Sequence, residues 1–128
     1  MDARQKSVSD ILYTGDQYVI PLFQRYYSWN KEHWARLKND IWALMEADAK
    51  AVHFLGPLVC TYSGHFPGSI QAFQLIDGQQ RLTTLTILLA AVRDIAVSLG
   101  IKDLAEEIAE NFLLHKRKQG SERYKVLP

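Results

Sequence analysis

Apolar residues are spaced along the first part of the chain in a pattern that predicts a short helix, an extended segment and a longer helix. Ser7–Tyr13 is expected to form the short helix, which Gly15 stops, and Gln17–Ile20 the extended segment. The longer helix should start after Asn30, a good N-cap residue, because apolar side chains then recur three and four positions apart. That apolar stripe consists of Trp34, Leu37, Ile41, Leu44 and Met45, while Arg36, Lys38, Asp40 and Glu46 are expected mostly on the other side.

The next part of the chain has the pattern of two strands followed by a long helix. Phe54–Tyr62 and Phe73–Ile76 are predicted to form an antiparallel pair, joined by a loop that is rich in glycine and proline. Gly78 ends the second strand, and a helix is expected over about Gln79–Ser98. The buried face of that helix should carry Leu82, Leu85, Leu88, Leu89, Val92 and Ile95.

A third helix and a final strand complete the pattern. Gly100 stops the long helix, and Asp103 with Glu106 three positions later resembles a capping box for the next helix. Tyr124–Leu127 has the character of the start of a strand. We therefore expect the chain to be a fragment of something longer.

Composition narrows the class of protein without indicating a function. The 128 residues are 48% hydrophobic and 23% charged, which is ordinary for one compact globular domain. A net charge of +1 gives no strong overall attraction to nucleic acid, so any nucleic-acid surface would be a local patch. A single cysteine excludes an internal disulfide and fits a reducing cytoplasm. The longest apolar stretch, Leu85–Val92, is too short to cross a bilayer, so we expect a soluble, cytoplasmic protein without membrane contact.

The strongest chemical signal is the run Asp77–Thr84, where a predicted strand ends and a predicted helix begins. The first N–H groups of such a helix lack intrahelical partners and lie at the positive end of its dipole, so the turn suits a phosphate. Gly78 would let a ligand approach the backbone closely. Arg81 could bind phosphate oxygens with two of its N–H groups.

Other polar residues of this turn have candidate roles of their own. Asp77 could hold a magnesium ion through water, and Gln79 or Gln80 could orient an attacking water molecule. A purely structural alternative remains open. Asp77 would then only cap the helix, while Thr83 and Thr84 would bond back to the preceding turn.

A second signal is the aromatic stretch Pro21–Trp29, in which Gln24 and Arg25 are set among apolar residues. A half-buried arginine needs a carboxylate or a phosphate as its partner. Either Arg25 serves a ligand, or it pairs with an acidic residue of its own domain while the aromatic residues fill the core.

Three motifs occur in order along the chain: Pro21–Trp29, Phe54-Leu55-Gly56 and Asp77–Leu85. Together they resemble the N-terminal domain family of the GmrSD type IV restriction endonucleases, and the N-terminal domain of the SspE defence protein is similar. The resemblance covers roughly Val8–Ile95, and three motifs in register are far more specific than any single short pattern.

This resemblance implies an α/β (α+β) fold of the ParB/sulfiredoxin-like type, with a small mixed or antiparallel sheet and packed helices. It implies binding and hydrolysis of a nucleoside triphosphate of unknown base, with Mg²⁺, at a site whose catalytic residues are Asp77, Gln79, Gln80 and Arg81. Asp77 would be the metal ligand. The nucleotide-binding residues expected beside them are Gln24, Arg25, Gly56, Gly78, Thr83 and Thr84.

The resemblance also implies partners. Domains of this family are usually coupled to an HNH-type nuclease domain that cuts foreign or modified DNA, and this chain shows no His-Asn-His constellation of its own. We therefore expect residues 1–128 to be a single regulatory domain of an anti-phage restriction protein, truncated on its C-terminal side, that gates the nuclease. A homo-oligomer is among the expected assemblies. The rival interpretation is a non-enzymatic, ParB-like DNA-binding module that the nucleotide only switches.

The remaining reactive residues are expected to be structural. Cys60 lies in a predicted strand and should be a small core residue. The four histidines have no metal-ligand spacing, although His53 directly precedes Phe54-Leu55-Gly56 and could reach the pocket. The three tryptophans are expected in the core or in interdomain contacts. One basic cluster either contacts DNA or complements a helix dipole, and consists of Lys116, Arg117, Lys118, Arg123 and Lys125.

Overall fold

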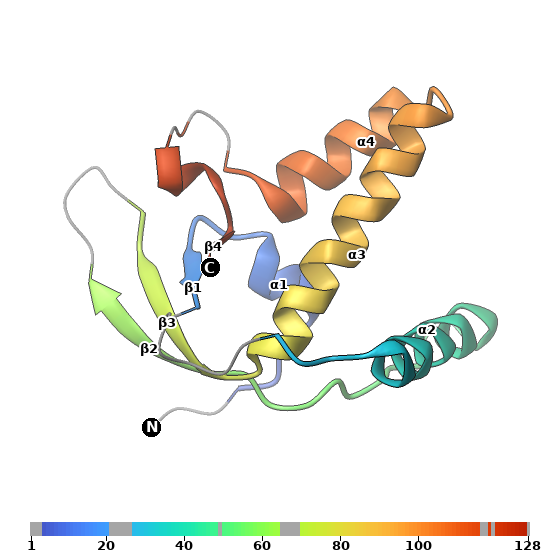
Figure 1. Cartoon of the computed structure of the whole chain (residues 1–128), viewed down its shortest axis with the longest axis horizontal. Coiled ribbons are helices and arrows are strands. Elements are labelled where there is room, and N and C mark those ends of the chain that lie inside the picture. Colours follow the sequence, from blue (N-terminus) through green and yellow to red (C-terminus); the bar gives the residue numbers. More distant parts are fainter. Residues whose placement is uncertain are drawn as a thin grey trace.

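The computed structural model describes residues 4–20, 27–48, 50–64, 70–115, 118 and 120–127 (Figure 1). Its helices are α1 (Val8–Leu12), α2 (Lys31–Glu46), α3 (Gln79–Ser98) and α4 (Lys102–Ile108), with α4 continuing into a π-helix, η1 (Ala109–Leu113), and a 3-10 helix, η2 (Gly120–Arg123), following. Its strands are β1 (Gln17–Val19), β2 (Val59–Gly64), β3 (Ala72–Asp77) and β4 (Val126–Leu127).

The four strands form one mixed sheet in the order β2-β3-β1-β4. β2 and β3 are antiparallel, as the sequence predicts, whereas β1 runs parallel to both β3 and β4. Tyr18 therefore lies at the centre of the sheet, in register with Phe73 on one side and Val126 on the other. An α+β fold with a small mixed sheet is confirmed, and the ParB/sulfiredoxin-like type stays a prediction.

The core forms where α1 and the first turns of α3 lie against the sheet (Figure 1). Its buried residues are Leu12 of α1, Tyr18 of β1, Leu75 of β3 and Leu82 of α3. Burial of each such side chain contributes about 1.5–3 kcal/mol. Desolvation, with Asp16 nearby, raises the pKa of Tyr18 to about 12, so its phenol stays neutral at physiological pH. This core fixes the position of the β3–α3 turn.

Helix boundaries follow the capping residues that the sequence offers. Ser7 and Asp10 form a reciprocal capping box at the start of α1. Asn30 accepts hydrogen bonds from the N–H groups of Glu32 and His33 at the start of α2. α3 spans Gln79–Ser98, as predicted, with Gly100 just beyond its end at a positive φ of 76°.

The strand predicted over Phe54–Tyr62 is wrong in its first half, because β2 begins only at Val59. Gly56 has a positive φ of 117°, outside the extended region of a regular strand, and Pro57 has no N–H for a ladder. Phe54 is accordingly exposed. Residues 53–58 instead cross beneath the start of α3, and this places them at the candidate site described below.

The buried face predicted for α3 is correct only near the beginning of the helix. Leu82 is buried, but Leu88, Val92 and Ile95 are exposed. The reason is geometric, because α3 extends far beyond the sheet and, among the described elements, α4 lies beside its distal half (Figure 1). Within the described ranges, no helix combines the length and the apolar character that a membrane span requires.

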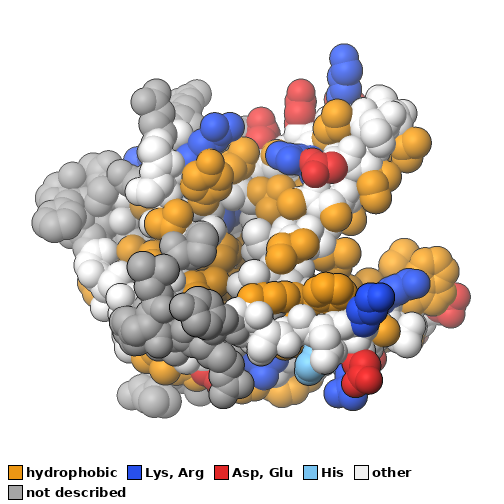
Figure 2. All heavy atoms as spheres, in the orientation of Figure 1, with side chains coloured by type: hydrophobic (Ala, Val, Ile, Leu, Met, Phe, Trp, Pro, Cys, Tyr) orange, Lys and Arg blue, Asp and Glu red, His pale blue; other side chains and the backbone are white. Residues whose placement is uncertain are grey.

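α2 also buries less than its pattern predicts. Leu37 is buried, but Trp34, Trp42 and Met45 are exposed. Of the two locations predicted for the tryptophans, the core is therefore excluded for Trp34 and Trp42, and contact with another domain stays a prediction. α2 stands apart from the sheet (Figure 1), and Figure 2 shows a hollow between it and the α3–α4 pair, bordered by hydrophobic side chains.

Two local predictions are also corrected. Asp103 does not cap α4, because the helix already begins at Lys102 and its N-cap residue, Ile101, makes no side-chain capping bond. Cys60 is exposed rather than part of the core, since β2 is an edge strand with one open face.

Lys125 belongs to the predicted basic cluster but lies inside the protein. It is only 4% exposed, and its Nζ donates to the carbonyl oxygens of Leu12 and Asn111, both at 2.6 Å. Desolvation lowers its pKa. Lys125 thus joins α1 to η1 next to β4, and neither DNA contact nor dipole complementation describes it. Lys116 and Arg117 of the cluster lie outside the described residues.

Replacing Lys125 with Met should lower the free energy of unfolding by about 2–4 kcal/mol, because two buried carbonyl oxygens lose their donor. Lys38→Met, at an exposed position of α2, is the matched control and should change it by less than about 0.5 kcal/mol. Urea denaturation followed by circular dichroism measures both. Equal stability of the two variants would contradict the structural role of Lys125.

His115 is a half-buried titratable group near the sheet. Its Nε2 lies 2.9 Å from the carbonyl oxygen of Asp16, and because a carbonyl only accepts, this nitrogen carries the proton. Desolvation, with the charge of Lys125 adding to it, lowers the pKa of His115 below its usual 6.5. The folded protein therefore favours the neutral ring.

This depressed pKa makes stability depend on pH. As the pH falls below 6.5, the unfolded chain takes up a proton at His115 before the folded chain does, so the free energy of unfolding should decrease. The slope contributed by this one group reaches at most about 1.4 kcal/mol per pH unit. Denaturation curves between pH 8 and pH 5 should show this loss in the wild type and a shallower one in His115→Gln. Parallel pH profiles would contradict the assignment.

Candidate functional site

The site is built where the segment before β2 meets the start of α3. Arg81, in the first turn of α3, donates from Nη1 to the carbonyl oxygen of Pro57 at 2.6 Å. Its guanidinium lies flat against Gly56, since a Cβ atom at position 56 would lie 2.8 Å from Cζ of Arg81. Gly56 therefore provides both the positive φ and the space that this arginine needs.

Gly78 packs against the same segment. A Cβ at position 78 would come within 2.8 Å of Cδ1 of Leu58 and 3.0 Å of the carbonyl oxygen of Pro57. Its φ of 91° makes the sharp turn from β3 into α3, and its N–H donates to Oδ1 of Asp77 at 2.8 Å. The space beside its Cα, where a ligand was expected, holds Pro57 and Leu58 of the same chain. The structural alternative assigned the helix cap to Asp77. That cap is absent, because the N-cap residue of α3 is Gly78 and makes no side-chain capping bond.

The residues before α2 dock onto the other side of α3. The N–H of Ser28 donates to Oε1 of Gln80 at 2.7 Å, and the hydroxyl groups of Tyr27 and Thr84 lie 2.7 Å apart. Nε1 of Trp34 donates to the same Tyr27 hydroxyl at 2.8 Å. The described part of the first motif thus meets the third motif directly.

The remaining candidates have mainly local contacts. Thr84 is buried, and its hydroxyl bonds back to the carbonyl oxygen of Gln80 at 2.7 Å, as the structural alternative anticipated. Gln79 donates from Nε2 to the carbonyl oxygen of Ile76 at 2.9 Å, while Thr83 is half-buried in the first turns of α3. Gln24 and Arg25 lie outside the described residues.

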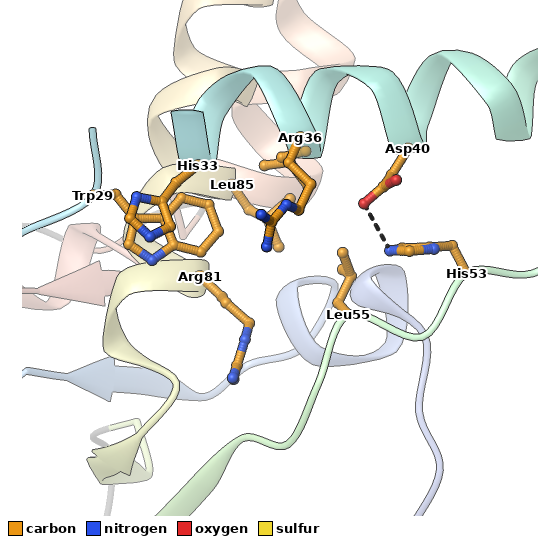
Figure 3. A pocket seen from close by; sticks show the side chains of 9 residues that line it. Trp29, His33, Arg36, Asp40, His53, Leu55, Arg81 and Leu85 are labelled. Atoms are coloured by element: carbon orange, nitrogen blue, oxygen red, sulfur yellow. Dashed lines mark ion pairs between the residues drawn. The ribbon is translucent and has the colours of Figure 1, made fainter. Parts of the chain in front are cut away.

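A cavity of about 250 Å³ lies between α2, the segment that precedes β2 and α3 (Figure 3). Of the predicted site residues that the structure describes, only Arg81 lines it. Asp77 does not, so the cavity and the carboxylate of the turn are separate parts of the site. The side chains that line the cavity are Trp29, His33, Arg36, Leu37, Asp40, His53, Leu55, Arg81 and Leu85.

The polar walls of the cavity are ordered by two contacts. Nε2 of His53 lies 3.3 Å from Oδ2 of Asp40, the ion pair drawn in Figure 3. On the other side, the rings of Trp29 and His33 stack with centroids 5.3 Å apart and planes at 19°. Arg36 reaches in from α2, and Arg81 lies across the cavity from it (Figure 3).

Sequence reasoning missed the contribution of α2. It assigned Arg36 and Asp40 to the side of α2 away from its apolar stripe, yet both line the cavity with Leu37. A signal was present, because His33, Arg36 and Asp40 are spaced three and four positions apart and so share one helical face. The sequence allowed His53 to reach the pocket without requiring it, and His53 does line the cavity.

Metal binding by the described residues would need further ligands. Across the described residues, no three His, Cys, Asp or Glu side chains gather in a group that could hold an ion. Mg²⁺, however, commonly takes one or two carboxylates and completes its shell with water and substrate phosphates. The single exposed carboxylate of Asp77 fits that arrangement and does not fit a metal cage made of protein alone.

Fold and site together define an α+β domain with a cation-lined cavity beside a strand-to-helix turn. The family model described as "GmrSD restriction endonuclease, N-terminal domain" matches residues 8–127. The chain therefore belongs to the family of GmrSD restriction endonuclease N-terminal domains, which makes it a module of DNA-restriction proteins, as its three motifs predicted. No curated protein matches the chain in sequence.

The contact between Gly56 and Arg81 can be tested by mutation. Gly56→Ala should lower the free energy of unfolding by about 0.5–1.5 kcal/mol more than Gly64→Ala, because the guanidinium must move away from the new methyl and loses its hydrogen bond to the carbonyl oxygen of Pro57. Gly64 is the matched control, since its φ of 127° is also positive but nothing lies within 4 Å of its Cβ position. Chemical denaturation measures the difference.

A double-mutant cycle isolates the cause of that loss. In Gly56→Ala combined with Arg81→Ala, the additional destabilisation should disappear, because the clashing side chain has been shortened. An unchanged loss would show that Arg81 does not lie on Gly56.

Proposed function

We propose that this domain binds a nucleoside triphosphate with Mg²⁺ and hydrolyses it, and that this reaction regulates a DNA restriction endonuclease. The observation that carries the proposal is the placement of Arg81. Its guanidinium is anchored on one side by the carbonyl oxygen of Pro57 and borders the cavity on the other. An anchored guanidinium suits phosphate, because its position is set before the ligand arrives.

The other residues of the turn supply positioning in this proposal. Asp77, exposed beside the start of α3, would hold Mg²⁺ together with phosphate oxygens and water, and the ion would neutralise phosphate charge. Gln80 has its Oε1 on the Ser28 N–H, so it ties the segment before α2 to the turn. Gln79 would orient the attacking water. Phosphoryl transfer depends mainly on such positioning and charge stabilisation, so no protein nucleophile is needed.

Membership of a restriction endonuclease family supports the regulatory role. A hydrolysed phosphate changes the charge next to Arg81, and Arg81 contacts the segment that leads into β2. Loss of that charge would alter how this segment and α2 pack on α3. A nuclease region, of HNH type in our proposal, would respond to that change and cut foreign DNA in defence against phage.

Isothermal titration of the wild type with ATP, GTP, CTP and UTP in the presence of Mg²⁺ tests binding, and release of inorganic phosphate tests hydrolysis. Arg81→Ala should weaken binding of the preferred nucleotide by about tenfold or more and abolish turnover, since a charge-assisted bond to phosphate is lost. Arg93→Ala is the matched control, because Arg93 lies on α3 paired with Asp94, away from the cavity. It should bind and turn over nucleotide as the wild type does.

The possible results discriminate between the candidate functions. Turnover that survives Arg81→Ala would refute the assignment of the site. Binding without any phosphate release would favour the rival function, a ParB-like module that the nucleotide only switches.

A further inference from the structure

The cavity beside Arg81 presents a second arginine from a different helix. Arg36 extends from α2 toward the space that Arg81 borders from α3 (Figure 3). Within the described part of the chain, Arg36 makes no hydrogen bond and no ion pair. Two guanidinium groups that face one cavity repel each other unless an anion lies between them. Their arrangement is therefore typical of an oxyanion site.

Neither acidic residue one helical turn from Arg36 pairs with it within the described part of the chain. Glu32 precedes Arg36 by four positions on α2 and forms no ion pair there. Asp40 follows Arg36 by four positions, the spacing at which an arginine and an acidic residue can pair along a helix. Its Oδ2 instead lies 3.3 Å from Nε2 of His53. Because Asp40 pairs with His53, the guanidinium of Arg36 is available to bind a ligand.

The size and lining of the cavity limit what the ligand can be. Pockets that enclose a drug-sized molecule usually measure about 300–1,000 Å³, whereas this cavity measures about 250 Å³. It can therefore enclose a part of a nucleotide, such as a phosphate group, but not all of it. Leu37, Leu55 and Leu85 line part of it with apolar surface. The carboxylate of Asp40, which also lines the cavity, points toward His53 (Figure 3).

We propose that this cavity binds a phosphate group of the nucleotide between Arg36 and Arg81, and that Arg36 is a phosphate-binding residue supplied by α2. The inference deepens the proposed function, because it identifies where a phosphate lies and which second helix holds it. Bound phosphate would then join α2 to the start of α3, in addition to the hydrogen bonds that Tyr27, Ser28 and Trp34 make between these parts.

Titration with inorganic pyrophosphate tests the site without any contribution from base or ribose. Arg36→Ala should weaken binding of both pyrophosphate and the preferred nucleotide by about tenfold or more, because one of two charge-assisted contacts is lost. Lys38→Ala removes one positive charge from the same helix at an exposed position outside the cavity, and it should stay within about twofold of the wild type. Arg36→Lys keeps the charge and should restore part of the affinity.

Circular dichroism and thermal unfolding, run in parallel, identify variants that fold as the wild type does. Arg36 is exposed and has no hydrogen bond or ion pair with another described residue, so Arg36→Ala should unfold at the wild-type temperature. If Arg36→Ala binds as tightly as the wild type while Arg81→Ala does not, the inference is overturned and the proposed function stands. If pyrophosphate binding depends on Arg36 but the wild type releases no phosphate from any nucleotide, the proposed hydrolysis fails and the anion site stands. Equal losses in Arg36→Ala and Lys38→Ala would reduce the effect to general charge and overturn the inference.

Discussion

The turn from β3 into α3 is the constraint on which the rest of the site depends. Gly78 makes that turn at a positive φ and lies against Pro57 and Leu58. The same contact brings the segment before β2 beneath the helix, where its backbone receives the side chain of Arg81. A larger residue at the turn would separate the two segments, so a single close approach of backbone to backbone determines where the cationic group of the site is held.

Much of the fold was predictable because its determinants are local. The cap at Asn30, the strand ending at Gly78 and the helix Gln79–Ser98 follow from capping, turn geometry and apolar spacing within short windows. The parallel pairing of β1 and the exposure of the distal half of α3 were not predictable in this way. Both depend on which distant segment packs against which face. Apolar spacing along a helix indicates that one face is buried but does not identify the element that packs against that face.

The candidate site likewise has one part with local determinants, which was predictable, and one part with non-local determinants, which was not. Asp77–Thr84 was recognisable as a strand-to-helix turn with residues suited to ligand binding, because these residues are contiguous in the sequence. The cavity was not, since three separate segments line it and its second arginine, Arg36, was expected on the side of α2 opposite the apolar stripe. Only the path of residues 53–58 beneath α3 brings His53 to Asp40 and makes that face an inner wall.

The order of strands in the sheet has a consequence for how the chain folds. β1 lies between β3 and β4, so Tyr18, near the N-terminus, pairs with Phe73 and with Val126. β1 is therefore made before both of its partners. The backbone groups on one of its edges stay unpaired until β3 has been made, and those on the other edge until β4 has been made. Such non-local pairing slows folding and lengthens the time for which an open strand edge is exposed to aggregation. The sheet is therefore complete on both sides of β1 only after the residues of β4 have been made.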